Sequence, residues 1–434
     1  MVDKMTKLDT LIQELCPDGV EYKELKSVFE MRNGYTPSKA KAEFWEGGTI
    51  PWFRMEDIRE NGNILSDSAQ HITPAAVKGK LFPANSIIVA TSATIGEHAL
   101  ITVESLANQR FTYLVRRPEY EEKLDPKFVY YYCYKLDEWC LNNTNISSFP
   151  SVDMAKFAKF KIPIPPLPVQ REIVRILDNF TELTAELTAE LTARKKQYEY
   201  YRDSLLTFGV HRRGTVETKW RTLGEVCNSI ADGDHMPPPK SDSGIPFITI
   251  SNITEQNKVD FSNTMFVPCA YYNALAEKRK PQKGDILYTV VGSYGIPVCI
   301  ENETEFVFQR HIAILRPKMQ IINPRYMYHA MQTTAFKAQA DKAAKGAAQK
   351  TISLHSLSEM TLPVPSLEVQ ERLIDVLDHF DAICSDLNIG LPAEIEARKK
   401  QYEYYRDMLL TFAAADDIIL TDRQTDRQTD RQTG

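Results

Sequence analysis

One sixteen-residue segment occurs twice in this chain. Residues 193–208 read ARKKQYEYYRDSLLTF and residues 397–412 read ARKKQYEYYRDMLLTF, so a single position differs. Upstream, KIPIPPLPVQREIVRILDNF (161–180) matches TLPVPSLEVQERLIDVLDHF (361–380) at an offset of 200 residues, whereas the offset of the later pair is 204. A repeat at this spacing indicates a chain built from two copies of one module.

A weaker repeat extends into the rest of each half. IPWFRMEDI (50–58) resembles IPFITISNI (245–253), and NQRFTYLVRRP (108–118) resembles FQRHIAILRP (308–317). Each half is therefore a variable body of about 145 residues followed by a nearly constant segment of about 40. Variable bodies on constant segments indicate one scaffold that carries two different recognition surfaces.

The constant segments have the apolar spacing of long helices. From Val169 to Leu205, apolar residues recur at steps of three and four, and the prolines before Val169 set the start. About 38 helical residues would span ~57 Å. The second helix should be interrupted at Gly390-Leu391-Pro392. Two such helices most simply pack on each other, and an antiparallel pair would place the bodies at opposite ends.

The polar residues of the constant segments are repeated as closely as the apolar ones. Near-identity on every helix face exceeds what a buried stripe requires, so we predict a partner bound once by each half, with recent gene duplication as the competing explanation. The candidate partner-binding residues are Lys195, Lys196, Arg202, Lys399, Lys400 and Arg406.

The first constant segment also contains TELTAELTAEL (181–191), a tandem four-residue unit. Each unit adds about one helical turn, ~6 Å. We interpret it as a spacer, with harmless low complexity as the alternative.

Both bodies are rich in short β-branched and aromatic runs punctuated by Gly, Pro and Asn, which predicts an α+β fold with twisted antiparallel strands. Tyr130, Tyr131, Tyr132, Tyr326 and Tyr328 follow an Asp-Pro or Asn-Pro helix start, so we expect them in core helices rather than stacked on bases.

The polar, glycine-bearing loops between strands are the better candidates for contacting nucleic acid, because their side chains match base edges and phosphates. Each residue taken singly is more often a solvated loop residue. The candidates are Arg32, Asn33, Tyr35, Thr36, Lys39, Lys41, Arg54, Thr91, Ser92, Thr94 and Asn145 in the first body, and His235, Lys240, Thr249, Ser251, Asn252, Ser293, Tyr294, Lys345, Gln349 and Lys350 in the second.

The dipeptide Gln-Arg recurs in both bodies, as Gln109-Arg110 and Gln309-Arg310. We expect a buried arginine paired within the fold, with a phosphate contact as the second possibility. The net charge of −6 and pI of about 5.9 count against a simple nucleic-acid binder. Affinity for phosphate must then be clustered, or supplied in part by a partner.

Several classes of site are missing from the sequence. There is no P-loop, no glycine-rich dinucleotide or methyl-donor loop after a strand, and no H-E-x-x-H or G-x-S-x-G. The histidines have no metal-ligand spacing, and the seven cysteines form no C-x-x-C pair. We therefore predict no catalytic residues and no metal site. No signal peptide or membrane span is evident, so we expect a cytoplasmic protein.

A body that ends in IPIPPLPVQ (162–170) or LPVPSLEVQ (362–370) and continues into a long helix, twice over, resembles the specificity (S) subunit of type I restriction-modification systems. The TAEL units and the QYEYYRD segments are similar to the IC group. The resemblance covers residues 1–412.

The resemblance implies an α+β protein in which two α/β target-recognition domains are joined by two long antiparallel helices in a coiled coil with pseudo-twofold symmetry. It implies recognition domains at 1–165 and 213–365 and helices at 166–212 and 366–412. The repeat tail at 413–434 departs from the family pattern, and we expect it to be disordered.

Each domain would read one half of a split double-stranded DNA site. The helices would set the gap and dock two methyltransferase (M) subunits, to which restriction (R) subunits are added. This chain would bind no cofactor itself; S-adenosylmethionine, ATP and Mg²⁺ would be used by the partners.

The chain ends in TDRQTDRQTDRQ (421–432), which is what a continuous ACAG repeat encodes. We hypothesise a slippage-prone, phase-variable gene; a chance peptide repeat is the alternative. The competing functions are an orphan or phase-variable specificity protein that only redirects methylation, a self-contained modification enzyme, and a coiled-coil adaptor that does not bind DNA. The missing methyl-donor loop argues against the enzyme, and the divergent bodies argue against the adaptor.

Overall fold

The computed structural model describes residues 6–145, 150–207, 218–233, 238–254, 256–347, 349–385 and 390–413. The chain divides into two compact units. Unit 1 comprises Met1–Ala185 and Ala397–Gly434, and unit 2 comprises Glu186–Glu396. Each unit therefore combines one body with parts of both constant segments. The predicted tail lies outside the described residues except for Ala413, and so does the candidate His235.

The body of unit 1 is built on a five-stranded sheet in the order β2-β9-β6-β7-β4. All neighbours are antiparallel except β4 and β7. A three-stranded sheet, β5-β3-β8, has a parallel β3–β8 pair. The strands are β1 (Tyr22–Glu24), β2 (Phe29–Asn33), β3 (Ile50–Phe53), β4 (Ile64–Leu65), β5 (His71–Ile72), β6 (Ser86–Ala90), β7 (His98–Ile101), β8 (Leu106–Ala107), β9 (Phe111–Arg116), β10 (Thr144–Asn145), β11 (Ser151–Val152) and β12 (Lys161–Pro163).

The body of unit 2 repeats this plan with a four-stranded sheet, β14-β20-β17-β18, and a three-stranded sheet, β16-β15-β19. The pair β15–β19 is again parallel. The strands are β13 (Lys219–Thr222), β14 (Cys227–Asp232), β15 (Ile245–Ile248), β16 (Met265–Val267), β17 (Ile286–Thr289), β18 (Pro297–Cys299), β19 (Val307–Phe308), β20 (Ile312–Pro317) and β21 (Thr361–Val364).

Further helices complete the body of each unit. In unit 1 they are α1 (Lys7–Leu15), α2 (Leu25–Val28), α3 (Met55–Asn61), α4 (Pro126–Asn142) and α5 (Met154–Phe157), with 3-10 turns η1 (Ala42–Phe44), η2 (Pro74–Ala76) and η3 (Pro118–Tyr120). In unit 2 they are α7 (Leu223–Val226), α8 (Cys269–Ala274), α9 (Pro324–Met331), α10 (Thr334–Ala343) and α11 (Leu354–Ser358), with η4 (Ile250–Asn252) and η5 (Glu277–Arg279). Tyr130, Tyr131 and Tyr132 of α4 and Tyr326 and Tyr328 of α9 are buried, as the sequence predicts.

The constant segments form the predicted long helices. The first is α6 (Leu167–Leu206), of 40 residues, and the second is divided into α12 (Leu367–Ser385) and α13 (Leu391–Leu409). The division falls at the predicted Gly390-Leu391-Pro392 interruption, because a proline ring is tolerated only in the first turn of a new helix.

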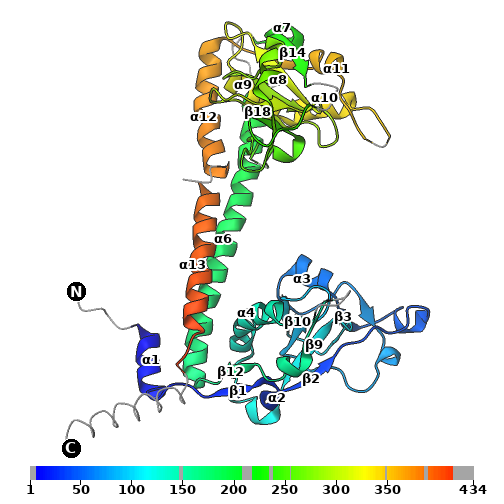
Figure 1. The fold of residues 1–434 in the computed structure, drawn as a ribbon, viewed down its shortest axis with the longest axis vertical. Helices are drawn as coiled ribbons and strands as arrows, with labels where there is room; N and C mark the ends of the chain where they lie inside the picture. The colour runs from blue at the N-terminus through cyan, green and yellow to red at the C-terminus, as the bar shows by residue number, and fades with distance from the viewer. Residues whose placement is uncertain are drawn as a thin grey trace, which may run out of the picture. The chain divides into compact units, whose positions relative to one another are not determined.

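The two constant segments pack against each other within each unit (Figure 1). In unit 1, Phe180 of α6 stacks on Tyr405 of α13, with ring centroids 5.5 Å apart. In unit 2, Tyr201 of α6 stacks on Phe380 of α12, with centroids 5.6 Å apart. Phe180 matches Phe380 in the repeat and Tyr201 matches Tyr405, so the same pair of rings is formed twice. The predicted helix pair is confirmed.

Each core is completed by a helix end from the other half of the sequence. The core of unit 1 contains Val169 and Leu177 of its own constant segment, together with Leu410 from the far end of the chain. The core of unit 2 contains Leu377 of its own segment, together with Tyr198 and Leu206 of α6. The end of each constant segment therefore contributes to the core of the body that belongs to the other half.

Candidate nucleic-acid interface and helix–body junctions

One end of the main sheet collects most of the predicted contact loops in each unit. In unit 1 this end holds residues 33–36, 91–96 and 108–110, because β2 and β6 end there and β9 and β7 begin there. The β10–β11 hairpin joins them through a bridge between Ser92 and Ser151. In unit 2 the same end holds residues 232–233, 290–295, 309–311 and the hairpin around Lys345 and Thr351. We call this end the loop edge of each unit.

The two loop edges share hydrogen bonds that fix which residues are equivalent. The amide of Asn108 donates to the carbonyl of Phe53 at 3.0 Å, and the amide of Gln309 donates to that of Ile248 at 2.8 Å. The amides of Thr91 and Val290 donate to the carbonyls of Arg110 and His311 at 3.0 and 2.8 Å. Arg110 is therefore the counterpart of His311, and Gln109 is the counterpart of Arg310.

This register corrects the sequence alignment by one residue at the Gln-Arg dipeptides. The predicted buried pairing of these arginines is also wrong, because Arg110 and Arg310 are both exposed. Among the described residues, neither guanidinium has an ion pair, which leaves both available to DNA.

A glycine is required at the first turn of each loop edge. A Cβ on Gly34 would lie 2.2 Å from the carbonyl oxygen of Ala107, and one on Gly233 would lie 2.1 Å from that of Phe308. Both contacts are with backbone and cannot be relieved by rotating a side chain. The backbone of this turn can therefore approach the end of the neighbouring strand only if the residue at this position is glycine.

The second loop of each edge has the same unusual backbone. Ala93 and its counterpart Gly292 both have positive φ, at 67° and 74°, and so do Gly96 and Gly295. The amides of Ala93 and Gly292 donate to the carbonyls of Pro150 and Lys350 in the adjoining hairpins. An alanine in the left-handed region carries strain, of a kind that concentrates at functional loops.

Most of the candidate contact residues on the loop edges are accessible. Exposed or half-buried side chains are those of Arg32, Asn33, Tyr35, Thr36, Ser92, Thr94 and Asn145 in unit 1, and of Ser293, Tyr294, Lys345, Gln349 and Lys350 in unit 2.

Some of these accessible side chains already have internal partners. Arg32 stacks on Phe82 at 4.5 Å, and the Thr36 hydroxyl donates to Gln109 Oε1 at 2.6 Å. The Tyr294 hydroxyl donates to Asp341 Oδ1 at 2.9 Å. These contacts hold the side chains against the body and so orient the loops.

Two candidates need correction, because their side chains support loops from within. Thr91 is 5% exposed and its hydroxyl is bonded to that of Thr112 at 2.9 Å. Asn252 is 8% exposed and holds Thr249 N, Asp260 O and Asn263 O. We no longer place either among the DNA contacts.

The remaining candidates lie outside the strand ends of the main sheet. Lys39 and Lys41 are exposed in the segment after β2, where Lys41 also lies over the ring of Phe44. Arg54 follows β3, and Thr249 and Ser251 follow its counterpart β15. Lys240 is exposed before β15.

The loop edge of unit 2 encloses a cavity of about 310 Å³. Its polar lining includes Asp232, Arg310, His311 and Gln349, and its apolar lining includes Val290, Val291, Ile352 and Leu354. Burial, with the nearby charge of Arg310, lowers the pKa of His311. The imidazole is therefore neutral at neutral pH.

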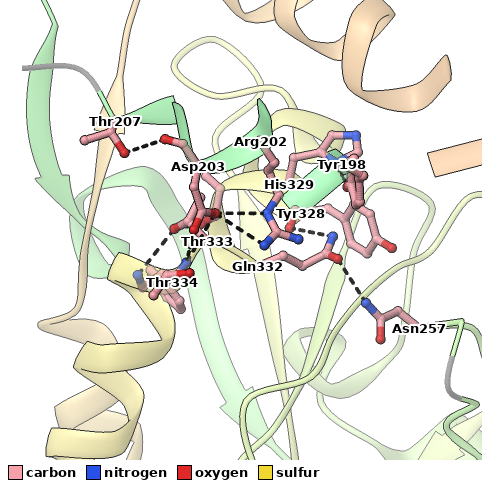
Figure 2. Close-up of polar contacts among 12 residues, drawn as sticks. Tyr198, Arg202, Asp203, Thr207, Asn257, Tyr328, His329, Gln332, Thr333 and Thr334 are labelled. Atoms are coloured by element: carbon pink, nitrogen blue, oxygen red, sulfur yellow. Dashed lines mark hydrogen bonds and ion pairs between the residues drawn. The ribbon is translucent and has the colours of Figure 1, made fainter. Parts of the chain in front are cut away.

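The end of α6 is fastened to the body of unit 2 by a polar network, shown in Figure 2. The Tyr198 hydroxyl and His329 Nδ1 lie 2.9 Å apart. His329 Nε2 in turn lies 2.6 Å from Asp378 of α12. Asp203 accepts from the amide of Thr334, the first residue of α10, at 3.2 Å. A carboxylate at this position also favours the start of α10.

The junction in unit 1 uses the same positions with different groups. Asp178, the counterpart of Asp378, accepts from Lys127 Nζ at 2.7 Å and from the Tyr131 hydroxyl at 2.7 Å. Arg406, the counterpart of Arg202, lies 4.5 Å over the ring of Tyr134. The Tyr22 hydroxyl donates to the carbonyl of Phe412 at 3.0 Å, which secures the end of the constant segment.

A buried glutamine holds the start of each long helix, and the sequence reading missed its role. Gln170 accepts from the amide of Asp125 at 2.8 Å and donates to the carbonyls of Lys123 and Pro165. Gln370 makes the same three bonds with Asn323, Ile321 and Pro365. The repeated Val-Gln dipeptide was the available signal, because a polar residue kept inside an apolar stripe needs partners.

The candidate partner-binding residues separate into two groups. Lys195, Lys196, Lys399 and Lys400 are exposed. Arg202 is 3% exposed and lies over the ring of Tyr198, so its prediction as a surface residue needs correction. The Arg406 side chain is 18% exposed and covers Tyr134. The repeated arginine therefore serves the helix–body junction.

A repeated surface feature that the sequence reading left out is a pair of tyrosines. Tyr200 and Tyr404, which are counterparts, are 69% and 65% exposed. Each packs edge-on against the neighbouring tyrosine that forms the helix–helix stack.

Within the described ranges, no group of three or more His, Cys, Asp and Glu residues could hold a metal ion. Over the same ranges, no helix is both long and apolar enough to cross a membrane.

The sequence matches the family described as type I restriction modification DNA specificity domain twice, over residues 17–194 and 215–397. The chain belongs to this family. As a type I specificity protein with two such domains, it carries one match in each half of the internal repeat.

Individual relatives agree with the family match. The chain is 44% identical to the type I restriction enzyme EcoprrI specificity subunit of Escherichia coli, over 88% of this chain and 93% of that one. It is 33% identical to the EcoR124I/EcoR124II specificity subunit of Escherichia coli, over 67% and 72%. A chain from a structural study of assembly and conformational transition in a type I system covers 91% of this specificity protein at a TM-score of 0.64 and 17% identity, which shows a shared fold.

Proposed function

We propose that this chain is the DNA-recognition subunit of a type I restriction-modification complex and reads a split, asymmetric double-stranded site. The observation that carries the proposal is the pair of loop edges, which share one backbone plan but present different side chains. At equivalent positions, unit 1 has Asn33 and Gln109 where unit 2 has Asp232 and Arg310. Two readers of one design that differ in chemistry suit two different half-sites.

The constant helices would serve as the scaffold and the ruler of this complex. Because Lys195, Lys196, Tyr200 and their counterparts are exposed and repeated, each helix end offers the same surface to a methyltransferase subunit. Two copies would bind, and restriction subunits would join through them. The partners would use S-adenosylmethionine, ATP and Mg²⁺, and the complex would act on DNA in the cytoplasm. The TAEL units and QYEYYRD segments support placement in the IC group.

Co-expression with the cognate methyltransferase subunit, followed by genome-wide mapping of methyladenine, tests this function. We expect one split motif with a fixed gap. Insertion of one further TAEL unit into residues 181–191 of α6 should lengthen the gap and leave both half-sites unchanged. Methylation no different from that of the methyltransferase subunit alone would contradict the recognition role, and altered half-sites at an unchanged gap would contradict the ruler.

The repeat tract at residues 421–432 favours a phase-variable form of the same function, in which the gene changes frame by slippage. Sequencing of single colonies tests this second proposal. Colonies that differ by whole ACAG units would support it, and an invariant tract of mixed codons would contradict it.

A further inference from the structure

The cavity at the loop edge of unit 2 combines a fork of donors with a carboxylate acceptor. Arg310 contributes the donors from the turn before β20, and Asp232 contributes the acceptor from the end of β14. Both side chains line the same space of about 310 Å³. A site with this pair of groups is chemically more selective than a surface of lysines.

The guanidinium of Arg310 has donors suited to a base edge and is accessible to a ligand. Its side chain is exposed, and among the described residues no ion pair engages it. A guanidinium presents parallel N–H donors, which match O6 and N7 of guanine in the major groove. A lysine at this position would supply the charge without the paired donors.

Asp232 lines the same cavity as Arg310 and forms an ion pair with Arg279. Its Oδ1 lies 3.6 Å from Nη2 of Arg279, and its side chain is 18% exposed. A carboxylate can accept several hydrogen bonds at once. In the major groove, a carboxylate accepts from N4 of cytosine.

We propose that this cavity reads one G·C base pair, with Arg310 on the guanine and Asp232 on the cytosine. The inference rests on the proposed function and assigns chemistry to one of its two half-sites. Neutral His311 leaves Arg310 as the cation of the cavity, and Val290 and Val291 line it with apolar surface. If an A·T pair took this place, the carboxylate would face O4 of thymine, which is also an acceptor. A charged group that loses its donor in a partly buried site raises the free energy of binding.

The equivalent positions of unit 1 carry the opposite preference. Asn33 replaces Asp232 and Gln109 replaces Arg310. Side-chain amides pair with N6 and N7 of adenine. Unit 1 therefore lacks the charged pair that selects G·C, and the two units form a natural comparison for the test.

The test is methylome mapping of the full chain co-expressed with its methyltransferase subunit. For the double variant Asp232→Asn/Arg310→Gln, which reproduces the chemistry of unit 1, we expect one base pair of one half-site to change. The preference for G·C there should fall by about tenfold or more, as expected for loss of a bidentate contact. The other half-site and the gap should remain as in the wild type.

Two control variants separate base reading from other roles. Arg310→Lys keeps a phosphate contact, so an unchanged motif with this variant would overturn the proposal, whereas relaxation at the same base pair supports it. Lys283 is an exposed lysine that precedes β17, at the end of the strand that lies away from the loop edge. The variant Lys283→Gln should therefore leave the motif intact. If the double variant methylates the wild-type motif at full strength, or loses both half-sites equally, the assignment is wrong.

The proposed function and this inference fail in different ways. A wild-type chain that directs no split motif would refute the recognition role and the inference with it. A wild-type split motif without G·C in either half-site would refute the inference alone.

Discussion

The two helix–body junctions keep one acid in common and differ in everything that meets it. In unit 1, Asp178 is met by Lys127 and Tyr131; in unit 2, Asp378 is met by Arg325 and His329. The acid stands on the constant helix and its partners stand on the variable body. The difference shows that a body can exchange its side of the junction, provided that the replacements still donate to the carboxylate.

The exchange has made the junction of unit 2 the more highly charged of the two. Arg325 pairs with Asp378 at 2.6 Å, Asp381 at 2.9 Å and Glu301 at 3.3 Å, whereas Lys127 pairs with Asp178. Burial opposes the charge on Arg325, but the carboxylates outweigh it and raise its pKa. Unit 2 therefore depends more on electrostatics at this point than unit 1.

The largest effect should come from the glutamines, which are common to both junctions. Gln170→Ala and Gln370→Ala each strand buried backbone groups that cost about 1–3 kcal/mol apiece, so we expect a loss of about 3 kcal/mol in either variant. Denaturant unfolding followed by circular dichroism measures it. Exposed neighbours provide the controls Arg171→Ala and Glu371→Ala, which should cost less than about 0.5 kcal/mol. If the free energy of unfolding fell no more than in the controls, the hydrogen bonds of the two glutamines would not contribute to stability.

The junction acids should separate the two units. Asp378→Asn leaves the fully buried His329 and the largely buried Arg325 with a weaker partner, so we expect a loss of about 2 kcal/mol. Asp178→Asn weakens a pair with the 43%-exposed Lys127, and should cost about 1 kcal/mol. The same unfolding experiment compares them, with Asp375→Asn as the control on the exposed face of α12. Equal losses would mean that the extra charges of unit 2 add nothing.

The left-handed loop position should respond with opposite signs in the two units. Gly292→Ala places a Cβ 3.3 Å from Gln349 Nε2 at a φ of 74°, and should cost about 1 kcal/mol. Ala93→Gly relieves the same strain but raises the conformational entropy of the unfolded chain, so we expect the free energy of unfolding to rise by less than about 1 kcal/mol. Thermal unfolding is the measurement. Gly224→Ala, where the nearest contact would be an ordinary 3.5 Å, should be neutral or stabilising.

The smallest effect should be a pH dependence that belongs to unit 2. Burial lowers the pKa of His329 below 6.5, although Asp378 opposes the shift and Arg325 adds to it. The unfolded state then binds the proton more readily, so stability falls as the pH drops below 6.5. Between pH 7.5 and 6.0 one proton changes the unfolding free energy by less than about 1 kcal/mol. His329→Gln should remove this part of the slope, and an unaltered slope would assign it to other groups.

The sequence predicted the periodic parts of the fold well, because periodicity reports burial directly. The long helices, the interruption at Gly390-Leu391-Pro392 and the buried tyrosines of α4 and α9 follow from spacing and from proline geometry. The two-body plan follows from the repeat. None of these inferences requires knowing which distant segments meet.

The parts that the sequence did not predict depend on contacts between segments that are distant in sequence. Arg202 reads as a surface residue until the body of unit 2 covers it. Gln170 finds two of its three partners 45 and 47 residues upstream, where no local pattern points. The Gln-Arg dipeptides invite an alignment that the strand hydrogen bonds displace by one residue. That displacement makes Gln109, and not Arg110, the counterpart of Arg310, so it decides how the two units are compared.

The borrowed helix ends have a consequence for how the chain matures on the ribosome. Unit 2 is continuous in sequence, from Glu186 to Glu396, whereas the core of unit 1 needs Leu410, which is 1% exposed. Domains usually fold in the order of their synthesis. Here the first body to emerge has an incomplete core until translation is nearly finished, whereas the core of the second body can be completed earlier. The N-terminal reader is therefore the last to be finished, and a prematurely terminated chain would carry that unsealed surface with it.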